Sequence, residues 1–293
     1  MDLEKKAIER IRMASELSLY HYKQPLICTY SGGKDSDVML ELFKRSGVPF
    51  EVLNSHTTVD APPTVYHIRK RFRQLEEQGI KATIKYPPLT MWQLIPKKLL
   101  PPTRVARYCC AVFKEGNTPN RFVATGVRWA ESKKRQGRQE IEPSNYKLAK
   151  KMRTLDENAQ ERLIVERCEM RASMIVNPII DWKDRDIWEF YNAECGERNP
   201  LYDMGYYRVG CIGCPMTTGK SREKEFADFP TYRRAYIRAF DKMLDAIHAK
   251  GKTTIWKTGE DVFLWWMESK NIDGQYSMLI DGEEIIGYAE KRG

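Results

Sequence analysis

The segment that most constrains the fold of this chain is residues 30–36, Tyr-Ser-Gly-Gly-Lys-Asp-Ser. Residues 24–29 before it read as a short buried strand, and residues 37–43 after it carry apolar side chains at helical spacing. A glycine pair on a strand-to-helix turn lets the backbone approach a ligand, and the helix N-terminus presents free N–H groups to an anion. We therefore predict a phosphate-binding loop, hereafter the phosphate loop, made of Tyr30, Ser31, Gly32, Gly33, Lys34, Asp35 and Ser36.

The phosphate loop is not a Walker A loop, which has four residues between its first glycine and Gly-Lys-Ser/Thr. The alternative interpretation is an ordinary helix start with a flexible turn, because Ser, Gly and Asp also suit helix caps.

Predicted strands alternate with predicted helices along the chain. This alternation predicts an α/β fold with a mostly parallel sheet and helices on both faces, and a ligand site at the carboxyl ends of the strands. Residues 56–60 and 126–128 would then meet the phosphate loop there. The predicted strands are 24–29, 49–54, 80–86, 121–127 and 174–179, and the predicted helices include 3–19, 37–46 and 64–78.

We expect residues 1–220 to form a nucleotide-binding domain and residues 221–293 to form a helical C-terminal region. Residues 129–171 are charged and poor in apolar side chains, which predicts an insertion with a helix at about 146–165. Its basic residues form either a solvated, salt-bridged helix or a surface for nucleic acid or a partner protein.

The net charge of +9 favours an anionic partner, a nucleotide or a nucleic acid, although a generic basic surface gives the same sign. No stretch is long and apolar enough to span a membrane, and the first residues do not read as a signal peptide. We therefore expect a cytoplasmic protein with no membrane contact.

Four of the seven cysteines form two close pairs, the adjacent Cys109 and Cys110 and the C-x-x-C pair Cys211 and Cys214. Four thiolates from two segments suit an iron–sulfur cluster or a zinc ion. The side chains of adjacent cysteines point apart, which fits the separate irons of a cubane better than one zinc ion. The alternative for the C-x-x-C pair is a redox-active dithiol.

The other three cysteines carry weaker signals. Cys28 lies in the first predicted strand and reads as a buried core thiol. Cys168 and Cys195 have no partner at ligand spacing, so each is a candidate for a catalytic thiol or a replacement cluster ligand.

The phosphate loop and the two cysteine pairs together resemble the iron–sulfur type of the phosphoadenosine phosphosulfate (PAPS/APS) reductase-like family, within the N-type ATP pyrophosphatase (PP-loop) superfamily. Residues 125–135 resemble the family's T-G-[IV]-R-x-x-E-S-x-x-R, and residues 178–188 its P-x-x-x-W-x-x-x-[DE]-[VI]-W. Asn199-Pro-Leu-Tyr leads into the C-x-x-C as in the family, and residues 60–64 match more loosely. The resemblance covers about residues 25–230.

This resemblance implies an adenine-nucleotide alpha-hydrolase-like, Rossmann-like fold. It implies ATP, or APS or PAPS, on the phosphate loop with Asp60 and Gly126, and catalytic roles for Lys34, Asp35, Arg128 and Arg135. Asp35 and Asp60 are candidate Mg²⁺ ligands. The alternative is that they cap helices, which would give the same sequence pattern. The implied cofactor is a [4Fe-4S] cluster held by Cys109, Cys110, Cys211 and Cys214.

Two departures from the family favour ATP chemistry over sulfate reduction. The reductases carry a nucleophilic cysteine in a C-terminal E-C-G-[IL]-H motif, and no cysteine follows Cys214 here. Their phosphate loop is often degenerate, and here it is intact.

Three functions remain open. The first is an ATP-dependent sulfur-transfer enzyme that releases AMP and pyrophosphate, with a nucleic-acid acceptor and a sulfur donor or partner protein. The second is an APS or PAPS reductase that releases sulfite. The third is a non-catalytic nucleotide-binding regulator. In each case we expect a homo-oligomer or a subunit of a complex.

Overall fold

The computed structural model describes residues 2–114, 118, 120–133, 135–143, 173–268, 275–280 and 283–288. The helix predicted at about 146–165 and Cys168 lie outside the described residues. The chain forms two compact units, and both are built from separate segments. The first unit comprises Met1–His56, Pro62–Lys85 and Gly116–Gly210, and the second comprises Thr57–Ala61, Tyr86–Glu115 and Cys211–Gly293.

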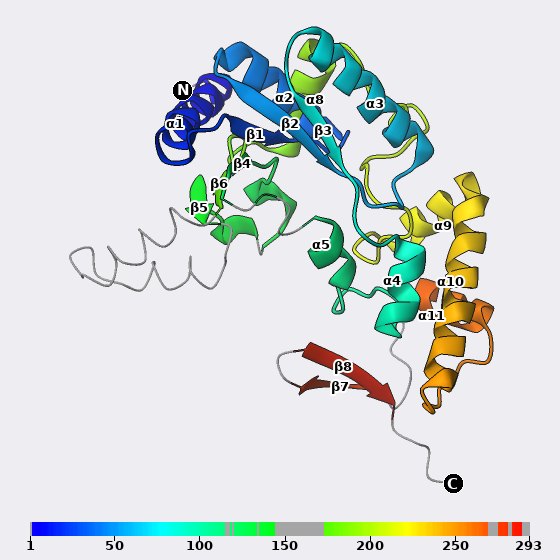
Figure 1. The fold of residues 1–293 in the computed structure, drawn as a ribbon. Coiled ribbons are helices and arrows are strands. Elements are labelled where there is room, and N and C mark those ends of the chain that lie inside the picture. The colour runs from blue at the N-terminus through cyan, green and yellow to red at the C-terminus, as the bar shows by residue number, and fades with distance from the viewer. Residues whose placement is uncertain are drawn as a thin grey trace, which may run out of the picture. The chain divides into compact units, whose positions relative to one another are not determined.

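The first unit is built on a six-stranded sheet with the order β3-β2-β1-β4-β6-β5 (Figure 1). Five strands run parallel, and β5 at one edge is antiparallel to β6. The strand order runs in opposite directions on the two sides of β1, so the switch point of the sheet lies between β1 and β4. The strands are β1 (Leu26–Thr29), β2 (Phe50–Ser55), β3 (Ala82–Lys85), β4 (Phe122–Ala124), β5 (Ile141–Pro143) and β6 (Met174–Val176).

In the described part of this unit, helices pack on the sheet and on one another and bury the core. Leu26, Cys28 and Tyr30 alternate along β1 and face this core, together with the apolar side of α2. The helices are α1 (Leu3–Tyr22), α2 (Lys34–Ser46), α3 (Pro62–Glu77) and α8 (Asp184–Glu194), with short 3₁₀ helices at Trp129–Glu131 and Arg135–Gly137.

The predicted α/β class with a mostly parallel sheet is confirmed. Four of the five predicted strands are longer than the observed ones, whereas the strand predicted at 49–54 is shifted by one residue from β2. The segment predicted at 174–179 ends as a strand at Val176, and residues 178–181 form turns. Strand β5 could not be predicted, because three residues inside a charged segment carry too short a pattern to be recognised.

The second unit is helical and includes a two-stranded antiparallel sheet. Within it α10 packs against α4 and α11, so packing does not follow the predicted linear boundary at residue 220. The predicted helices of the C-terminal region are present. The elements are α4 (Met91–Lys98), α5 (Tyr108–Phe113), α9 (Gly219–Asp228), α10 (Pro230–Ala249), α11 (Gly259–Glu268), β7 (Gln275–Ile280) and β8 (Glu283–Tyr288).

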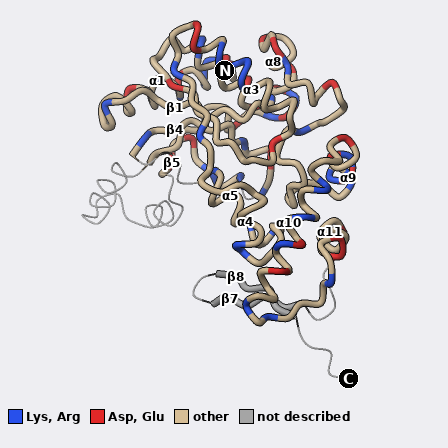
Figure 2. Tube along the Cα trace, turned by 45° about the vertical axis from the view of Figure 1, so that its right-hand side comes forward, with Lys and Arg blue, Asp and Glu red and all other residues tan. Residues whose placement is uncertain are grey.

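Basic and acidic residues are interleaved along the helices of both units (Figure 2). The basic residues between 144 and 171, for which the sequence leaves open a solvated helix or a surface for nucleic acid or a partner protein, lie outside the described residues. In the part of the chain that the structure describes, every helix is too short or too polar to cross a membrane.

Candidate functional site

The phosphate loop lies between the end of β1 and the first turn of α2. Gly33 is the N-cap residue of α2, and its N–H donates to Ser36 Oγ at 3.1 Å. Ser36 Oγ in turn donates to the carbonyl of Gly33 at 2.7 Å, and Ser31 Oγ lies 3.4 Å from Ser36 Oγ. Hydrogen bonds of its own serines therefore fix the conformation of the loop. The loop lies at the N-terminus of a 13-residue helix, where the helix dipole favours an anion.

At position 32 only glycine fits, because any side chain there would collide with the surrounding side chains. Its φ is +73°, and a Cβ added there would lie 2.9 Å from Ile68 Cγ1 and 3.1 Å from Thr64 Cγ2. Its carbonyl accepts a hydrogen bond from Asn199 Nδ2 at 2.6 Å. A Cβ on Gly33 would meet nothing closer than 3.5 Å, so the protein itself leaves room at Gly33.

We expect alanine to act differently at these two glycines. Gly32→Ala should lower the free energy of unfolding by about 1–4 kcal/mol, because it combines a strained backbone with crowding against α3. Gly33→Ala should leave the stability within about 1 kcal/mol but weaken nucleotide binding, because a methyl group then occupies space beside the phosphate. Urea unfolding and ATP titration of both variants check this. Equal loss of stability in the two would contradict it.

Lys34 is only 5% exposed, although it lies in the first turn of α2. Its Nζ lies 3.1 Å from Asp35 Oδ2 and 5.5 Å from the ring centroids of Trp188 and Tyr207. Its backbone N–H donates to the hydroxyl of Tyr202 at 2.7 Å. A phosphate bound at this amide would take the place of the tyrosine hydroxyl.

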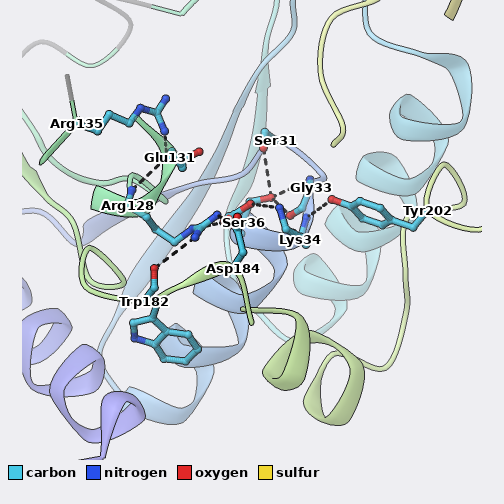
Figure 3. A network of polar contacts seen from close by, with 11 residues as sticks. Ser31, Gly33, Lys34, Ser36, Arg128, Glu131, Arg135, Trp182, Asp184 and Tyr202 are labelled. Carbon is cyan, nitrogen blue, oxygen red and sulfur yellow. Dashed lines mark hydrogen bonds and ion pairs between the residues drawn. The ribbon is translucent and has the colours of Figure 1, made fainter. Parts of the chain in front are cut away.

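Arg128 joins the phosphate loop to the segments that follow β4 and β6 (Figure 3). Its Nε lies 2.6 Å from Asp35 Oδ1, and its Nη2 lies 2.7 Å from Asp184 Oδ1. Its Nη1 donates to the carbonyl of Trp182 at 3.3 Å, and the residue is 1% exposed. Burial acts to raise the pKa of Asp184, but the hydrogen bond and charge of Arg128 lower it overall.

Gly126 and Arg135 complete this side of the site. A Cβ on Gly126 would lie 3.5 Å from the Cβ of Asp35, so the backbone after β4 passes close to the loop. Arg135 forms an ion pair with Glu131, whose carboxylate also accepts the Arg128 N–H at 3.1 Å. Burial lowers the pKa of Arg135, and the charge of the neighbouring Arg208 lowers it further. The structure thus brings Lys34, Asp35, Gly126 and Arg128 together. Arg135 is connected to them through Glu131, which contacts both arginines.

The side chain of Tyr30 faces the core and not the loop. It is 2% exposed, its hydroxyl donates to Asp37 Oδ1 at 2.5 Å, and it lies 3.0 Å from His67 Nε2. Its carbonyl accepts from Asn54 Nδ2 at 2.8 Å. Tyr30 therefore positions the start of the loop through its packing.

Sequence reasoning missed three residues that hold this site, namely Asp184, Asn199 and Tyr202. Asn199 and Tyr202 belong to the Asn-Pro-Leu-Tyr segment, so a signal for both was present. Asp184 lies at the start of α8 and had no pattern of its own.

All four cysteines of the two pairs belong to the second unit, and so does Asp60. The backbone at Asp60 pairs with Cys211 in an isolated β-bridge, and Ile212 N–H donates to the carbonyl of Val59 at 2.8 Å. The Asp60 carboxylate accepts the Thr57 N–H at 2.9 Å. Asp60 thus helps to fix the C-x-x-C segment, and its role as a nucleotide or Mg²⁺ ligand stays a prediction.

Cys109 and Cys110 lie on the short helix α5, where the chain supplies positive charge. Arg107 Nη2 donates to Cys110 Sγ at 3.7 Å. The hydrogen bond from Cys109 lowers the pKa of Cys110 to about 5, and Arg107 and Lys114 act in the same direction against burial. Among the described cysteines whose pKa is shifted, Cys110 is therefore the one that most readily loses its proton to form a thiolate.

The four thiols act on one another electrostatically. The charges of Cys110, Cys211 and Cys214 all raise the pKa of Cys109, after its hydrogen bond to Cys110 and its burial. Within the described ranges, no group of three or more His, Cys, Asp or Glu side chains stands close enough together to hold a metal ion. The side chains of Cys109 and Cys110, expected to point apart, instead share a hydrogen bond. Four cysteine thiols from two segments of one unit still match the donor set of a cubane.

The remaining described thiols are poor nucleophiles. Cys28 is fully buried in β1, as expected from the sequence, and burial raises its pKa. Cys195 follows α8 and is 7% exposed, and burial raises its pKa to about 12. Cys195 is thus ill suited to be a catalytic thiol.

The chain is similar to several known proteins over most of its length. An uncharacterized protein of Methanocaldococcus jannaschii is 24% identical over 262 residues, which is 85% of this chain and 54% of that protein. This chain therefore spans about half the length of that relative. An adenosine 5'-phosphosulfate reductase of Anoxybacillus flavithermus is 24% identical over 209 residues, 66% of this chain and 74% of the reductase.

Solved structures show weaker similarity. The PAPS reductase of Candida auris has a TM-score of 0.44 at 16% identity, covering 70% of this chain and 88% of that one. The U34-tRNA thiolase of Methanococcus maripaludis with its [4Fe-4S] cluster has a TM-score of 0.31 at 13% identity, covering 87% and 85%.

The family comparison covers both candidate sites, because residues 25–217 match the phosphoadenosine phosphosulfate reductase domain family. The match begins just before β1, includes the phosphate loop and all four paired cysteines, and ends just before α9. The chain therefore belongs to the phosphoadenosine phosphosulfate reductase domain family.

Proposed function

We propose that this chain is a PP-loop enzyme that cleaves ATP to AMP and pyrophosphate in order to activate an acceptor for sulfur transfer. The observation that carries the proposal is the intact phosphate loop at the N-terminus of α2, with Lys34, Asp35 and Arg128 in one ion-pair network. Membership of the PAPS reductase domain family supports an enzyme that acts on an adenine nucleotide.

Each residue of the network has a role in this reaction. The loop amides and Lys34 hold the β- and γ-phosphates, which leave as pyrophosphate. Arg128 neutralises charge at the α-phosphate, and Arg135 does so at the acceptor. Asp35 is the carboxylate available to a Mg²⁺ ion on the phosphates, in exchange for its present contacts with Lys34 and Arg128.

The bonds change in two steps. An acceptor oxygen attacks the α-phosphorus, and the bond from that phosphorus to the β-phosphate oxygen breaks, so the acceptor becomes adenylated. A sulfur nucleophile from a donor then forms a bond to the acceptor carbon, and AMP leaves with the oxygen. The basic character of the chain favours a nucleic-acid acceptor.

The experiment that tests this proposal is turnover of ATP labelled at the α-phosphate by anaerobically purified protein, with RNA and DNA supplied as acceptors and sulfide supplied as the sulfur donor. Formation of labelled AMP together with an equal amount of unlabelled pyrophosphate supports ATP activation, provided that Arg128→Met forms neither product. The family match favours a second candidate, sulfonucleotide reduction. Sulfite release from APS or PAPS with a thiol reductant, without ATP cleavage, would replace the first function by the second. Nucleotide binding with neither reaction would indicate a regulator.

We further propose that Cys109, Cys110, Cys211 and Cys214 hold a [4Fe-4S] cluster. Their shared electrostatic environment within one unit supports this, as does the positive charge of Arg107 and Lys114 beside Cys110. When bound, the cluster would supply an iron site for sulfur or electrons and would tie α5 to the C-x-x-C segment.

Anaerobically purified protein should be brown and contain about four iron and four sulfide per chain. Cys211→Ala should lose the cluster and destabilise the second unit, because the cluster then no longer joins its segments. Cys28→Ala is the matched control and should keep the cluster, since Cys28 is buried in β1. Iron and sulfide assays with the visible spectrum measure both. Zinc as the sole metal would refute the cluster.

A further inference from the structure

The second unit contains a buried arginine whose charge has no full counter-charge among the described residues. Arg222 lies on α9 and is 1% exposed. Its Nη1 donates to the carbonyl of Trp266 at 2.8 Å, and its guanidinium lies 4.0 Å from the centroid of the Trp266 ring. Its Nε and Nη2 are buried without any hydrogen-bond partner in the described part of the chain. Buried donors without a partner lower the stability of the fold, because burial removes the water that would otherwise accept their hydrogen bonds.

The acidic side chain of Glu225, whose charge acts on Arg222, does not remove this loss of stability. Glu225 lies one turn further along α9, and its Oε2 accepts the Gly213 N–H at 2.6 Å. Burial raises the pKa of Glu225 to about 7, so this carboxylate carries only part of a charge at neutral pH. Burial also lowers the pKa of Arg222, which means that its present surroundings disfavour the charged form.

Two contacts place Arg222 beside the C-x-x-C segment. The Trp266 ring on which Arg222 stacks would lie 2.8 Å from a Cβ on Gly213, and Glu225 on the same helix accepts the Gly213 N–H. The charges that act on Arg222 agree with this position. The pKa of Arg222 is raised by Tyr236, by Glu225 and then by Cys214, the last residue of the C-x-x-C pair. Lys114 differs from Arg222, because its pKa is raised by Cys211 first and by the carboxylate of Asp60 as well. Among the described residues, Arg222 is therefore a buried cation beside Cys214 that lacks a full anionic partner.

A [4Fe-4S] cluster with four thiolates would supply the missing negative charge. Such a cluster carries a net charge of about −2 when oxidised and about −3 when reduced. We infer that Arg222 is a positioning residue for this cluster: it is the buried counter-charge on the Cys214 side, and it favours the reduced state. This inference rests on the proposed cluster, and it goes beyond it by assigning a residue outside the four ligands.

The direction of the effect follows from Coulomb's law. Reduction adds a negative charge to the cluster, and a nearby cation stabilises the more negative state. Removing the cation should therefore make the cluster harder to reduce. A purely structural role for Arg222, through its stacking on Trp266, would change stability without changing the reduction potential.

The test is a redox titration of the cluster in the holoprotein, followed by electron paramagnetic resonance with dithionite as reductant. In Arg222→Met the equilibrium constant for one-electron reduction should fall at least tenfold, which is a shift of 59 mV to lower potential. Arg222→Gln should shift it in the same direction, and it keeps a donor for the Trp266 carbonyl in case the methionine variant does not fold. Arg222→Lys should restore most of the potential.

Arg238 on α10 provides the matched control, because it is an exposed arginine of the same unit. Arg238→Met removes the same charge and should leave the potential unchanged. A potential unchanged in both Arg222→Met and Arg222→Gln, with the cluster still bound, would overturn this inference alone. Absence of iron and sulfide from the unmodified protein would instead overturn the cluster proposal.

Discussion

Replacing Gly213 by alanine is expected to lower the free energy of unfolding of the second unit by about 2–5 kcal/mol. Gly213 has φ +72°, which costs a side-chain-bearing residue backbone strain. An added Cβ would also lie 2.7 Å from Phe226 Cζ, 2.8 Å from Trp266 Cη2 and 3.2 Å from Tyr236 Cε2. Three packed rings cannot all withdraw, so the C-x-x-C segment must shift.

Urea unfolding of the metal-free protein measures this effect, and the iron content shows whether the C-x-x-C segment still binds the cluster. Gly219→Ala is the matched control, because nothing lies within 4 Å of an added Cβ at Gly219 and its backbone is not left-handed. We expect the control to stay within about 1 kcal/mol of the parent. An unfolding midpoint shared by the two variants would show that Gly213 is not constrained by the rings.

The second large effect is expected on nucleotide affinity. Lys34→Ala removes the only lysine of the phosphate loop, and a charge-assisted hydrogen bond is worth about 1.5–3 kcal/mol. ATP should therefore bind about tenfold to over a hundredfold more weakly. The fold should persist, because Asp35 keeps its ion pair with Arg128 at 2.6 Å.

Isothermal titration with ATP measures this loss. Lys81→Ala is the control, because Lys81 precedes β3, carries the same charge and is 68% exposed beside Glu51. If the Lys34 and Lys81 variants lose affinity equally, general charge and not the loop would hold the nucleotide. The cluster should remain in both variants, since its proposed ligands belong to the other unit.

The sheet could be predicted from the sequence because its central strands are short apolar runs bounded by turn residues. The orientation of Tyr30 could also have been predicted: side chains alternate along a strand, so a core that contains Leu26 and Cys28 also receives Tyr30. The expectation that Tyr30 contacts the nucleotide follows from its place in the loop motif, whereas the alternation along the strand before it places its side chain in the core.

The partners of Arg128 could not be predicted in the same way. Asp184 lies 56 residues further along the chain, and no local pattern connects it with Arg128. The same holds for the second unit, which combines three separate segments. Long-range packing of this kind depends on how whole elements fit together, and periodicity within one element carries no information about it.

The three-segment construction of the second unit also has a consequence for how the chain folds during synthesis. The Trp92 ring on α4 packs against Tyr236 at 5.0 Å, and Trp266 Nε1 donates to the carbonyl of Pro102 at 2.6 Å. The ribosome adds roughly 150 residues between these partners, which takes about 8–30 s at about 5–20 residues per second. Until then α4 has no native partner from α10, so the nascent chain leaves exposed the apolar side chains that α4 buries in the folded unit, namely Met91, Leu94 and Ile95.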